Sequence, residues 1–210
     1  MIDLASDLAL IRAAARAAGT LAEQERERGL KITHKDGGSP VTNADMAVDT
    51  MLRATLLAAR PDYGWLSEET PDTPDRLTRR RIFVVDPIDG TVAFMKAKPW
   101  WCVPIAVVED GQPVAAVIHV PSLNESFEAT RGGGARLNDR PISPSDVDTL
   151  DDAAVLADAR LMEGPHWPEP WPPMRYEKRN ALAYRMALVA SGAFDAAIAL
   201  TPKFDWDVCA

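Results

Sequence analysis

Apolar side chains recur every three or four residues over positions 2–29 and again over positions 43–59. This spacing lines one face of a helix, so both segments are predicted to be amphipathic helices that pack against a core. The stripe of the first helix is short and rich in alanine, which fits packing in a globular domain better than a coiled coil. The residues expected to face inward are Leu4, Leu8, Ile11, Ala15, Ala18 and Ala22 in the first helix and Ala47, Met51, Ala54 and Ala58 in the second.

Short apolar runs bounded by turn residues follow, and these runs predict strands. Helical periodicity returns at residues 181–190, where Leu182, Met186 and Val189 share a face and Gly192 suits a C-terminal cap. Helices thus alternate with strands, several of them antiparallel neighbours, which indicates an α+β or layered α/β fold. The predicted strands are residues 64–67, 81–85, 102–108, 114–120, 126–130, 155–157 and 194–200, and the predicted loops are residues 30–41, 70–80 and 163–173.

The most informative motif directly follows the apolar run at residues 81–85 and reads Asp-Pro-Ile-Asp-Gly-Thr over residues 86–91. Its two carboxylates, Asp86 and Asp89, stand at the end of a buried strand, where proline and glycine shape a turn. Hard divalent cations bind such carboxylates together with a freed backbone carbonyl. Thr91 opens a short helix, whose first N–H groups suit an anion. The motif therefore predicts metal-assisted phosphoryl chemistry, and the simpler alternative is an Asp-rich turn followed by a threonine cap.

Further carboxylates appear in three other segments, residues 41–45, 65–70 and 204–207. Together with residues 86–91, they stand in the order Pro-Val-Thr-x-Ala-Asp, Glu-Glu, Asp-Pro-Ile-Asp-Gly-Thr and Trp-Asp. This set resembles the signatures of the inositol monophosphatase family of magnesium-dependent, lithium-sensitive phosphatases, and residues 132–138 resemble a strand turn of that family. The resemblance spans nearly the whole chain.

The resemblance implies an α+β fold, the layered αβαβα sandwich of the inositol monophosphatase and fructose bisphosphatase type. Residues 1–145 are expected to form an N-terminal α+β half that carries the main metal motifs. Residues 146–210 are expected to begin a C-terminal α/β half. Relatives continue beyond the Trp-Asp pair with a helix and further strand–helix structure, so the C-terminal half is expected to be incomplete here.

The resemblance also implies a ligand set for Mg²⁺, with two or three ions. Glu68, Asp86 and the carbonyl of Ile88 are expected to hold one ion, and Asp86, Asp89 and Asp207 a second. Glu68 counts with the catalytic residues for this reason. Asp207 has a second interpretation, because an aspartate at a strand–helix junction favours the start of a helix.

Asp45 and Thr91 are expected, by the same resemblance, to orient the attacking water, while the amides of Gly90 and Thr91 hold phosphoryl oxygens. Thr42 and Asp45 also fit a helix-capping box, which explains their spacing without catalysis. Lys35 lies in the glycine-rich loop, where relatives place a basic residue near the site, although a solvated lysine fits equally well.

The function expected from this set is hydrolysis of a small phosphate ester, inositol monophosphate-like, by metal-activated water. A 3'(2'),5'-bisphosphate nucleotidase is the closest alternative, and its second phosphate would need a cation such as Arg185. Arg185 could equally be a solvated helix residue. Fructose-1,6-bisphosphatase and histidinol-phosphate activities fit the residues less well. A different class of function is a non-catalytic interaction protein on the same scaffold.

The composition of the chain limits which partners and which cellular location are expected. The 210 residues suffice for one domain or two small packed ones, and a net charge of −8 argues against nucleic acid or membrane surfaces as partners. Cys102 and Cys209 show no disulfide or zinc spacing, and the acidic N-terminus is unlike a signal peptide. A cytoplasmic protein is therefore expected, and the family resemblance implies a homodimer.

Overall fold

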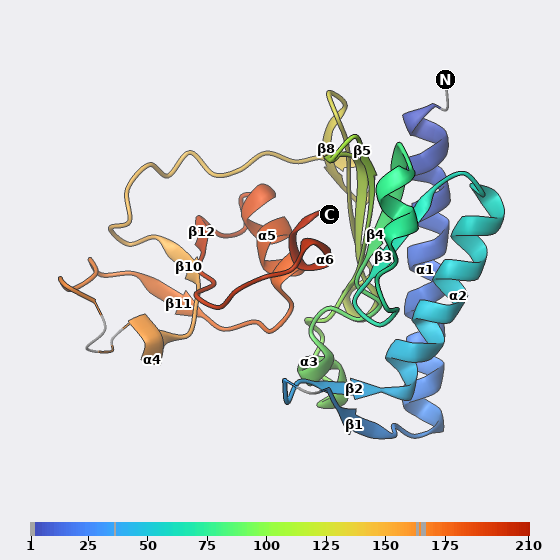
Figure 1. Ribbon diagram of the computed structural model, residues 1–210. Helices are drawn as coiled ribbons and strands as arrows, with labels where there is room; N and C mark the ends of the chain where they lie inside the picture. The colour runs from blue at the N-terminus through green and yellow to red at the C-terminus, as the bar shows by residue number, and fades with distance from the viewer. Residues whose placement is uncertain (1–2, 36, 163, 165–166) are drawn as a thin grey trace.

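The computed structural model describes residues 3–35, 37–162, 164 and 167–210. Figure 1 shows alternating helical and sheet layers: α1 (Leu4–Arg28) and α2 (Asn43–Ala59), a large sheet, then α5 (Leu182–Ala190) and α6 (Asp205–Val208), and a small sheet. These layers confirm the α+β class and the layered arrangement expected from the sequence.

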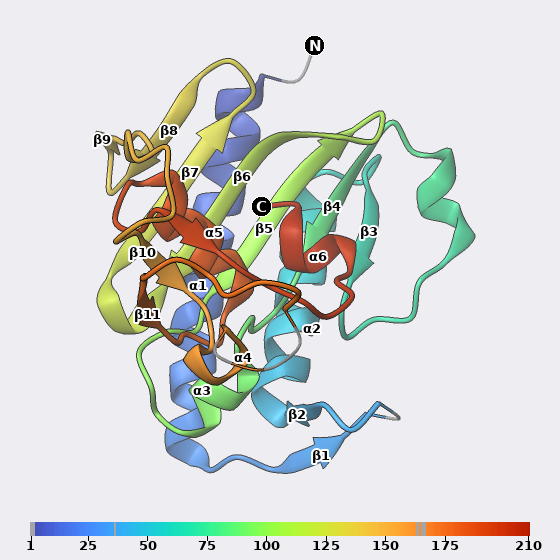
Figure 2. The same cartoon turned by 90° about the vertical axis from the view of Figure 1, so that its left-hand side faces the viewer.

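The large sheet has seven strands in the order β3-β4-β5-β6-β7-β8-β9. Only its edge pair β3 and β4 is parallel, and all other neighbours are antiparallel. Figure 2 shows α5 and α6 lying across this sheet. The strands are β3 (Gly64–Ser67), β4 (Arg81–Val85), β5 (Val103–Glu109), β6 (Gln112–Val120), β7 (Glu125–Thr130), β8 (Gly134–Leu137) and β9 (Arg140–Pro141).

Smaller elements complete the fold. A small parallel sheet has the order β11-β10-β12, and a separate hairpin joins β1 to β2. Their bounds are β1 (Ile32–His34), β2 (Pro40–Thr42), β10 (Ala154–Leu156), β11 (Arg175–Glu177) and β12 (Ala196–Ala197). The short helices are α3 (Thr91–Met95), α4 (Ala159–Met162) and the 3₁₀ turns η1 (Pro74–Thr78) and η2 (Pro121–Leu123).

Helix α1 begins and packs as its sequence predicts. Asp3 caps its N-terminus by accepting a hydrogen bond from the N–H of Ala5 at 3.1 Å. Small residues on the inward face bring the helix close to the sheet, and a Cβ on Gly19 would meet the Pro121 side chain at 2.5 Å. The buried members of the predicted stripe are Ile11, Ala15, Ala18 and Ala22.

Helix α2 occupies the predicted residues, but the inward face assigned from the sequence is wrong. Ala54 and Ala58 are exposed, whereas Val48, Leu52 and Leu56 are fully buried. The larger side chains decide the face because burying them gains more free energy than burying alanine. The same rotation buries two carboxylates of α2, Asp45 and Asp49.

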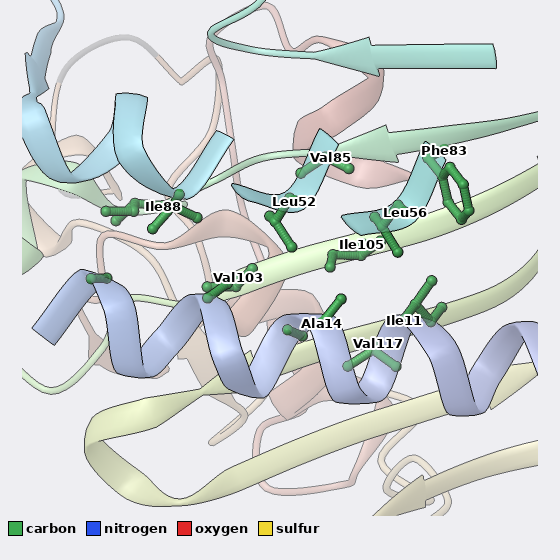
Figure 3. Close-up of a cluster of buried hydrophobic side chains, with 14 of the residues drawn as sticks. Ile11, Ala14, Leu52, Leu56, Phe83, Val85, Ile88, Val103, Ile105 and Val117 are labelled. Carbon is green, nitrogen blue, oxygen red and sulfur yellow. The ribbon is translucent and has the colours of Figure 1, made fainter. Parts of the chain in front are cut away.

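The main core lies between the helix pair and the large sheet. Figure 3 shows side chains of α1 and α2 meeting those of β4, β5 and β6. Ile88, directly after β4, belongs to this core with 1% exposure, so its side chain anchors the motif turn. A second apolar cluster on the other sheet face joins Ile118 and Phe127 to Tyr184 and Leu188 of α5.

Some predicted loops and strands differ from the structure. Residues 30–41 were predicted as a loop but form the β1–β2 hairpin, and residues 194–200 form only the two-residue strand β12. Met186, predicted to share the inward face of α5, is 38% exposed. The predicted loop at 163–173 lies partly outside the described residues. In the part of the chain that is described, no helix combines the length and apolar character needed to cross a membrane.

Candidate active site

The candidate site forms where two parallel strands end together. Ser67 of β3 pairs with Val85 of β4, so the residues that follow these strands, Glu68 and Asp86, reach the same edge of the sheet. The N–H of Glu68 donates to the carbonyl of Val85 at 3.3 Å and continues the pairing. A cleft of about 210 Å³ opens at this edge. Its lining residues are Ser39, Pro40, Glu68, Asp86, Ile88, Asp89, Gly90, Thr91, Val92, Asn180 and Asp207.

Local hydrogen bonds of Asp86 and Ile88 fix the turn after β4. One oxygen of Asp86 accepts the N–H of Ile88 at 3.0 Å, a local bond typical of aspartate in turns. The Ile88 side chain is buried, and its carbonyl accepts the Thr91 hydroxyl at 3.1 Å. Gly90 has φ +88°, a left-handed conformation that favours glycine. The sequence motif thus forms the expected strand-end turn.

Asp89 faces helix α5 as well as the cleft. Its two oxygens accept the N–H groups of Leu182 at 3.1 Å and Ala183 at 2.7 Å, at the start of α5. The thiol of Cys102 lies 3.6 Å from one of these oxygens. Unpaired N–H groups at a helix N-terminus stabilise a carboxylate, so Asp89 joins the motif turn to the C-terminal part of the chain.

Asp45 combines the two contacts that the sequence left as alternatives. Its Oδ2 accepts the Thr42 N–H at 2.8 Å and the Thr42 hydroxyl at 2.6 Å, which completes a capping box for α2. Its Oδ1 lies 3.2 Å from the hydroxyl oxygen of Thr91. Burial raises the pKa of Asp45, and the hydrogen bonds from Thr42 and Thr91 oppose that rise. Capping and contact with the motif turn therefore coexist in one carboxylate.

Lys35 reaches the site from the loop between β1 and β2. Its Nζ lies 2.8 Å from Oε1 of Glu68 and 2.8 Å from Oε1 of Glu69. Burial lowers the pKa of Lys35, but the two carboxylates outweigh it, so the net shift is upward. The alternative of a solvated lysine is therefore not what the structure shows, since Lys35 is paired with both glutamates.

Asp207 and Arg185 differ in their relation to the cleft. Asp207 lines it, and its Oδ2 accepts the Phe204 N–H at 2.9 Å at the start of α6. Arg185 does not line it. Its Nη2 donates to the carbonyl of Leu156 at 2.7 Å and to the carbonyl of Ile198, and burial lowers its pKa. Of the residues predicted as metal ligands, catalytic residues or substrate contacts, all but Arg185 and Asp45 line the cleft. Asp45 lies next to it and contacts the lining residue Thr91.

The charge of the cleft suits a cation. Burial, and then repulsion from Glu68, Asp89, Asp207 and Asp45, raises the pKa of Asp86 well above its usual range. Burial raises the pKa of Asp89 to about 7 against the opposing hydrogen bonds from α5, and the charge of Asp207 adds to the rise. Carboxylate and carbonyl oxygens are the donors that Mg²⁺ and other hard cations take. The residues present fit a divalent ion in chemistry and in charge.

The carboxylates predicted to bind metal do not converge on one common position in the cleft. Across residues 3–35, 37–162, 164 and 167–210, no group of three or more His, Cys, Asp or Glu side chains is arranged to hold a metal ion. Glu68 is turned to Lys35, Asp89 to α5 and Asp207 to the start of its own helix. Binding an ion would require these carboxylates to exchange such partners, and the predicted ligand set stays a prediction.

Asn180 lines the cleft from the segment before α5. Two contacts around the site were not predicted from the sequence: Glu69 shares Lys35 with Glu68, and Asp49 of α2 accepts hydrogen bonds from Ser67 and Thr70. Asp49 stands four residues after Asp45 and therefore on the same helix face. That spacing was a signal available in the sequence, but it was hidden by the wrong choice of inward face.

The chain combines a layered α+β fold with an acidic cleft at the edge of its large sheet. The chain belongs to the inositol monophosphatase family, whose sequence model matches residues 3–210. The family resemblance seen in the sequence is thereby confirmed. Members of this family are generally metal-dependent phosphatases.

Individual relatives agree on the family and differ in the substrate that their names give. An inositol-1-monophosphatase of Mesorhizobium japonicum is 37% identical over 132 residues, which is 62% of this chain and 49% of that protein. A histidinol-phosphatase of Mycobacterium tuberculosis is 35% identical over 196 residues, which is 86% of this chain and 72% of that protein. The chain spans about half the length of the first curated relatives that it matches.

A solved structure shows the same fold over a longer chain. The extragenic suppressor protein suhB from Bartonella henselae superimposes with a TM-score of 0.80 at 27% identity. The match covers 97% of this chain and 81% of that one. The expected shortness of this chain relative to its relatives is therefore confirmed.

Proposed function

We propose that this chain forms the metal-binding part of a phosphomonoesterase that hydrolyses a small phosphate ester, inositol monophosphate-like. One observation supports the proposal above all: Glu68 and Asp86 lie together where the parallel strands β3 and β4 end, and the turn formed by residues 86–91 lines the same cleft. The relatives' names support a phosphate ester as substrate and leave its alcohol portion open.

Glu68, Asp86, Asp89, Asp207 and the Ile88 carbonyl would hold the metal, which we propose to be Mg²⁺ in two or three ions. When bound, the metal would lower the pKa of a coordinated water and neutralise charge on the phosphoryl group. The chain's own residues supply orientation and proton transfer around that chemistry.

Thr91 and Asp45 would position the attacking water. The Thr91 hydroxyl has one hydrogen, which it directs to Asp45 or to the Ile88 carbonyl, so its lone pairs are open to a water. Asp45 stands behind it as an acceptor for the proton. Its raised pKa moves it toward neutrality, where general bases work best.

The amides of Gly90 and Thr91 would bind the phosphoryl oxygens. Within the described residues, neither N–H donates to another group of the chain. Both belong to the turn that opens α3, and Gly90 lines the cleft. Two free N–H groups beside the carboxylates provide an anchor for an anion that carboxylates alone would repel.

The nucleotidase alternative is less well supported than the inositol-type reaction. A second phosphate would need a cation at the cleft, and the side chain expected to supply it, Arg185, is bound to backbone carbonyls of Leu156 and Ile198. The alternative of a non-catalytic interaction protein is distinguished from the enzyme by a measurement of turnover. The proposal further includes lithium inhibition and a homodimer, which the family resemblance implies. It also includes a cytoplasmic location, with no nucleic acid or membrane as partner, which the composition and net charge favour.

A panel of phosphate esters with Mg²⁺ tests the proposal. Initial rates with inositol 1-phosphate, histidinol phosphate and adenosine 3',5'-bisphosphate should rank the inositol ester first. A preference for the bisphosphate would replace the proposed substrate with the nucleotidase alternative. Absence of turnover on every ester, with Mg²⁺ bound, would favour the interaction protein.

A further inference from the structure

Asp49 is a buried carboxylate that links α2 to the end of β3. Its Oδ1 accepts the hydroxyl of Ser67 at 2.5 Å, and its Oδ2 accepts the hydroxyl of Thr70. The residue is 5% exposed. Two hydroxyl donors, one on each oxygen, therefore hold a charged group inside the protein.

Such a carboxylate is costly unless its hydrogen bonds are made. Within the described residues, Asp49 forms no ion pair, so the hydroxyls of Ser67 and Thr70 are its side-chain partners. Hydrogen bonds from hydroxyls to an ionised carboxylate are short and stronger than those between neutral groups. The three side chains consequently form a stiff bridge between the helix and the strand end.

The bridge encloses the residues that matter for the cleft. Ser67 directly precedes Glu68, and Thr70 directly follows Glu69, so both ends of the Glu68–Glu69 pair are tied to the same carboxylate. Asp49 contacts no lining residue's carboxylate itself and can act only through the backbone that it fixes.

Helix α2 holds the other half of the site by the same face. Asp45, one turn earlier, contacts the Thr91 hydroxyl of the motif turn at 3.2 Å. A helix is rigid over one turn, so Asp45 and Asp49 set the separation between the motif turn and the Glu68 segment. The two segments arise from different strands, and backbone bonds of the large sheet reach as far as the N–H groups of Glu68 and Asp86, while Thr70 lies beyond them.

We propose that Asp49 is a positioning residue for Glu68 and that, through Ser67 and Thr70, it sets the affinity of the cleft for a divalent cation. The inference rests on the proposed function, because Glu68 is a ligand only if the cleft binds metal. Partners that orient metal ligands are typically worth about 10–100-fold in metal affinity.

Removing each hydroxyl separately tests the inference without leaving a space in the core. Thr70→Val keeps the shape of the side chain and Ser67→Ala removes one atom, whereas a change at Asp49 itself risks the fold. Thr50→Val is the matched control, because Thr50 lies beside Asp49 on α2 and its exposed hydroxyl bonds only within the helix, to the Met46 carbonyl at 2.8 Å. Calorimetric titration with Mg²⁺ alone gives the affinity, and urea unfolding in EDTA gives the stability.

We expect Thr70→Val and Ser67→Ala each to weaken Mg²⁺ binding about tenfold, with Thr50→Val unchanged. Variants that lose stability in EDTA but bind Mg²⁺ as tightly as the parent protein would overturn the inference and leave a purely structural bridge. If one of the two hydroxyl variants does not fold, the other still decides. A parent protein that binds no Mg²⁺ would contradict the proposed function itself. A parent protein that binds Mg²⁺, with variants that bind it equally tightly, would contradict only the role of Asp49.

Discussion

Among the residues that the structure describes, the carboxylate of Asp86 accepts one hydrogen bond, from the N–H of Ile88, while four other carboxylates repel it. Its negative charge therefore lowers the stability of the fold at neutral pH whenever no metal is bound. A buried carboxylate retained at such a cost is typical of a functional site. The amide of asparagine has nearly the same shape and can still accept the Ile88 N–H.

We expect Asp86→Asn to stabilise the metal-free protein, because burial and repulsion from neighbouring carboxylates raise the pKa of the Asp86 carboxyl well above its usual range. Thermal unfolding in EDTA at neutral pH measures the effect. The exposed Asp75→Asn is the control and should leave the melting temperature unchanged. A lower melting temperature for Asp86→Asn would show that the charge is compensated inside the protein.

His119 gives the stability a second dependence on charge, away from the cleft. It is buried on β6, and its Nδ1 lies 2.9 Å from the Ser126 hydroxyl oxygen. Burial lowers the pKa of His119 below the usual 6.5, a hydrogen bond from its ring to the backbone of Glu125 opposes the shift, and the charge of Arg16 adds to it. The unfolded chain therefore binds a proton more readily than the folded one.

Stability from the neutral His119 is consequently present above about pH 6.5 and is lost as the pH falls below that value. We predict that the free energy of unfolding decreases less between pH 7 and pH 5 in His119→Asn than in the parent protein. Urea unfolding at a series of pH values measures the difference. Parallel pH profiles for the two proteins would contradict the assignment.

Among the secondary-structure elements, those with strong periodicity or continuous apolar runs could be predicted from the sequence. Helices α1 and α2 and strand β4 lie where the patterns place them. The β1–β2 hairpin could not be predicted, because its β1 strand is exposed and carries no alternating pattern. The burial of Asp49 was missed because an acidic residue is normally assigned to the solvent face.

The meeting of the motif turn with α5 was also outside the reach of sequence patterns. Gly90 and Ala181 are far apart in the chain, yet a Cβ on Gly90 would lie 3.1 Å from the Ala181 Cβ. Only a tertiary structure can reveal such an approach. It brings the N–H groups of Leu182 and Ala183 onto Asp89.

Gly90→Ala should therefore destabilise the protein in two ways: the positive φ of residue 90 disfavours alanine, and the added Cβ would crowd Ala181. Gly111→Ala is the matched control, because Gly111 has a similar φ of +77° and no atom within 4 Å of its added Cβ. We expect Gly111→Ala to cost about 1–2 kcal/mol and Gly90→Ala at least about 1 kcal/mol more. Chemical unfolding of both variants measures the difference in the free energy of unfolding. An equal loss in the two variants would mean that α5 can shift to accommodate the added Cβ and would contradict the prediction.

In the molecule as a whole, the alternation of predicted helices and strands indicated an α+β or layered α/β fold, and the family motifs specified the αβαβα sandwich. The two sheets differ in how well their strands could be predicted. In the large sheet, β4, β5 and β6 have five to nine residues and are largely apolar, whereas β10, β11 and β12 of the small sheet have two or three residues. We propose that the chain divides into halves near residue 145. Residues 142–153 contain no helix or strand and are largely exposed.

Limited proteolysis should then cut first between residues 142 and 153 and give two fragments. The fragments should elute together in size-exclusion chromatography, because α5 packs on the large sheet through Leu188 and Tyr184 against Ile118 and Phe127. Initial cleavage inside the large sheet or within α2 would contradict the proposed division.

We propose that the acidic cleft at the ends of β3 and β4 makes this protein a metal-dependent phosphomonoesterase. Release of inorganic phosphate from inositol 1-phosphate, measured with Mg²⁺ and with EDTA, tests it most directly when Asp86→Asn is run beside the parent protein. We expect the parent protein to release phosphate with Mg²⁺ but not with EDTA, and Asp86→Asn to release none under either condition. Release that persists in EDTA, or in Asp86→Asn, would contradict it.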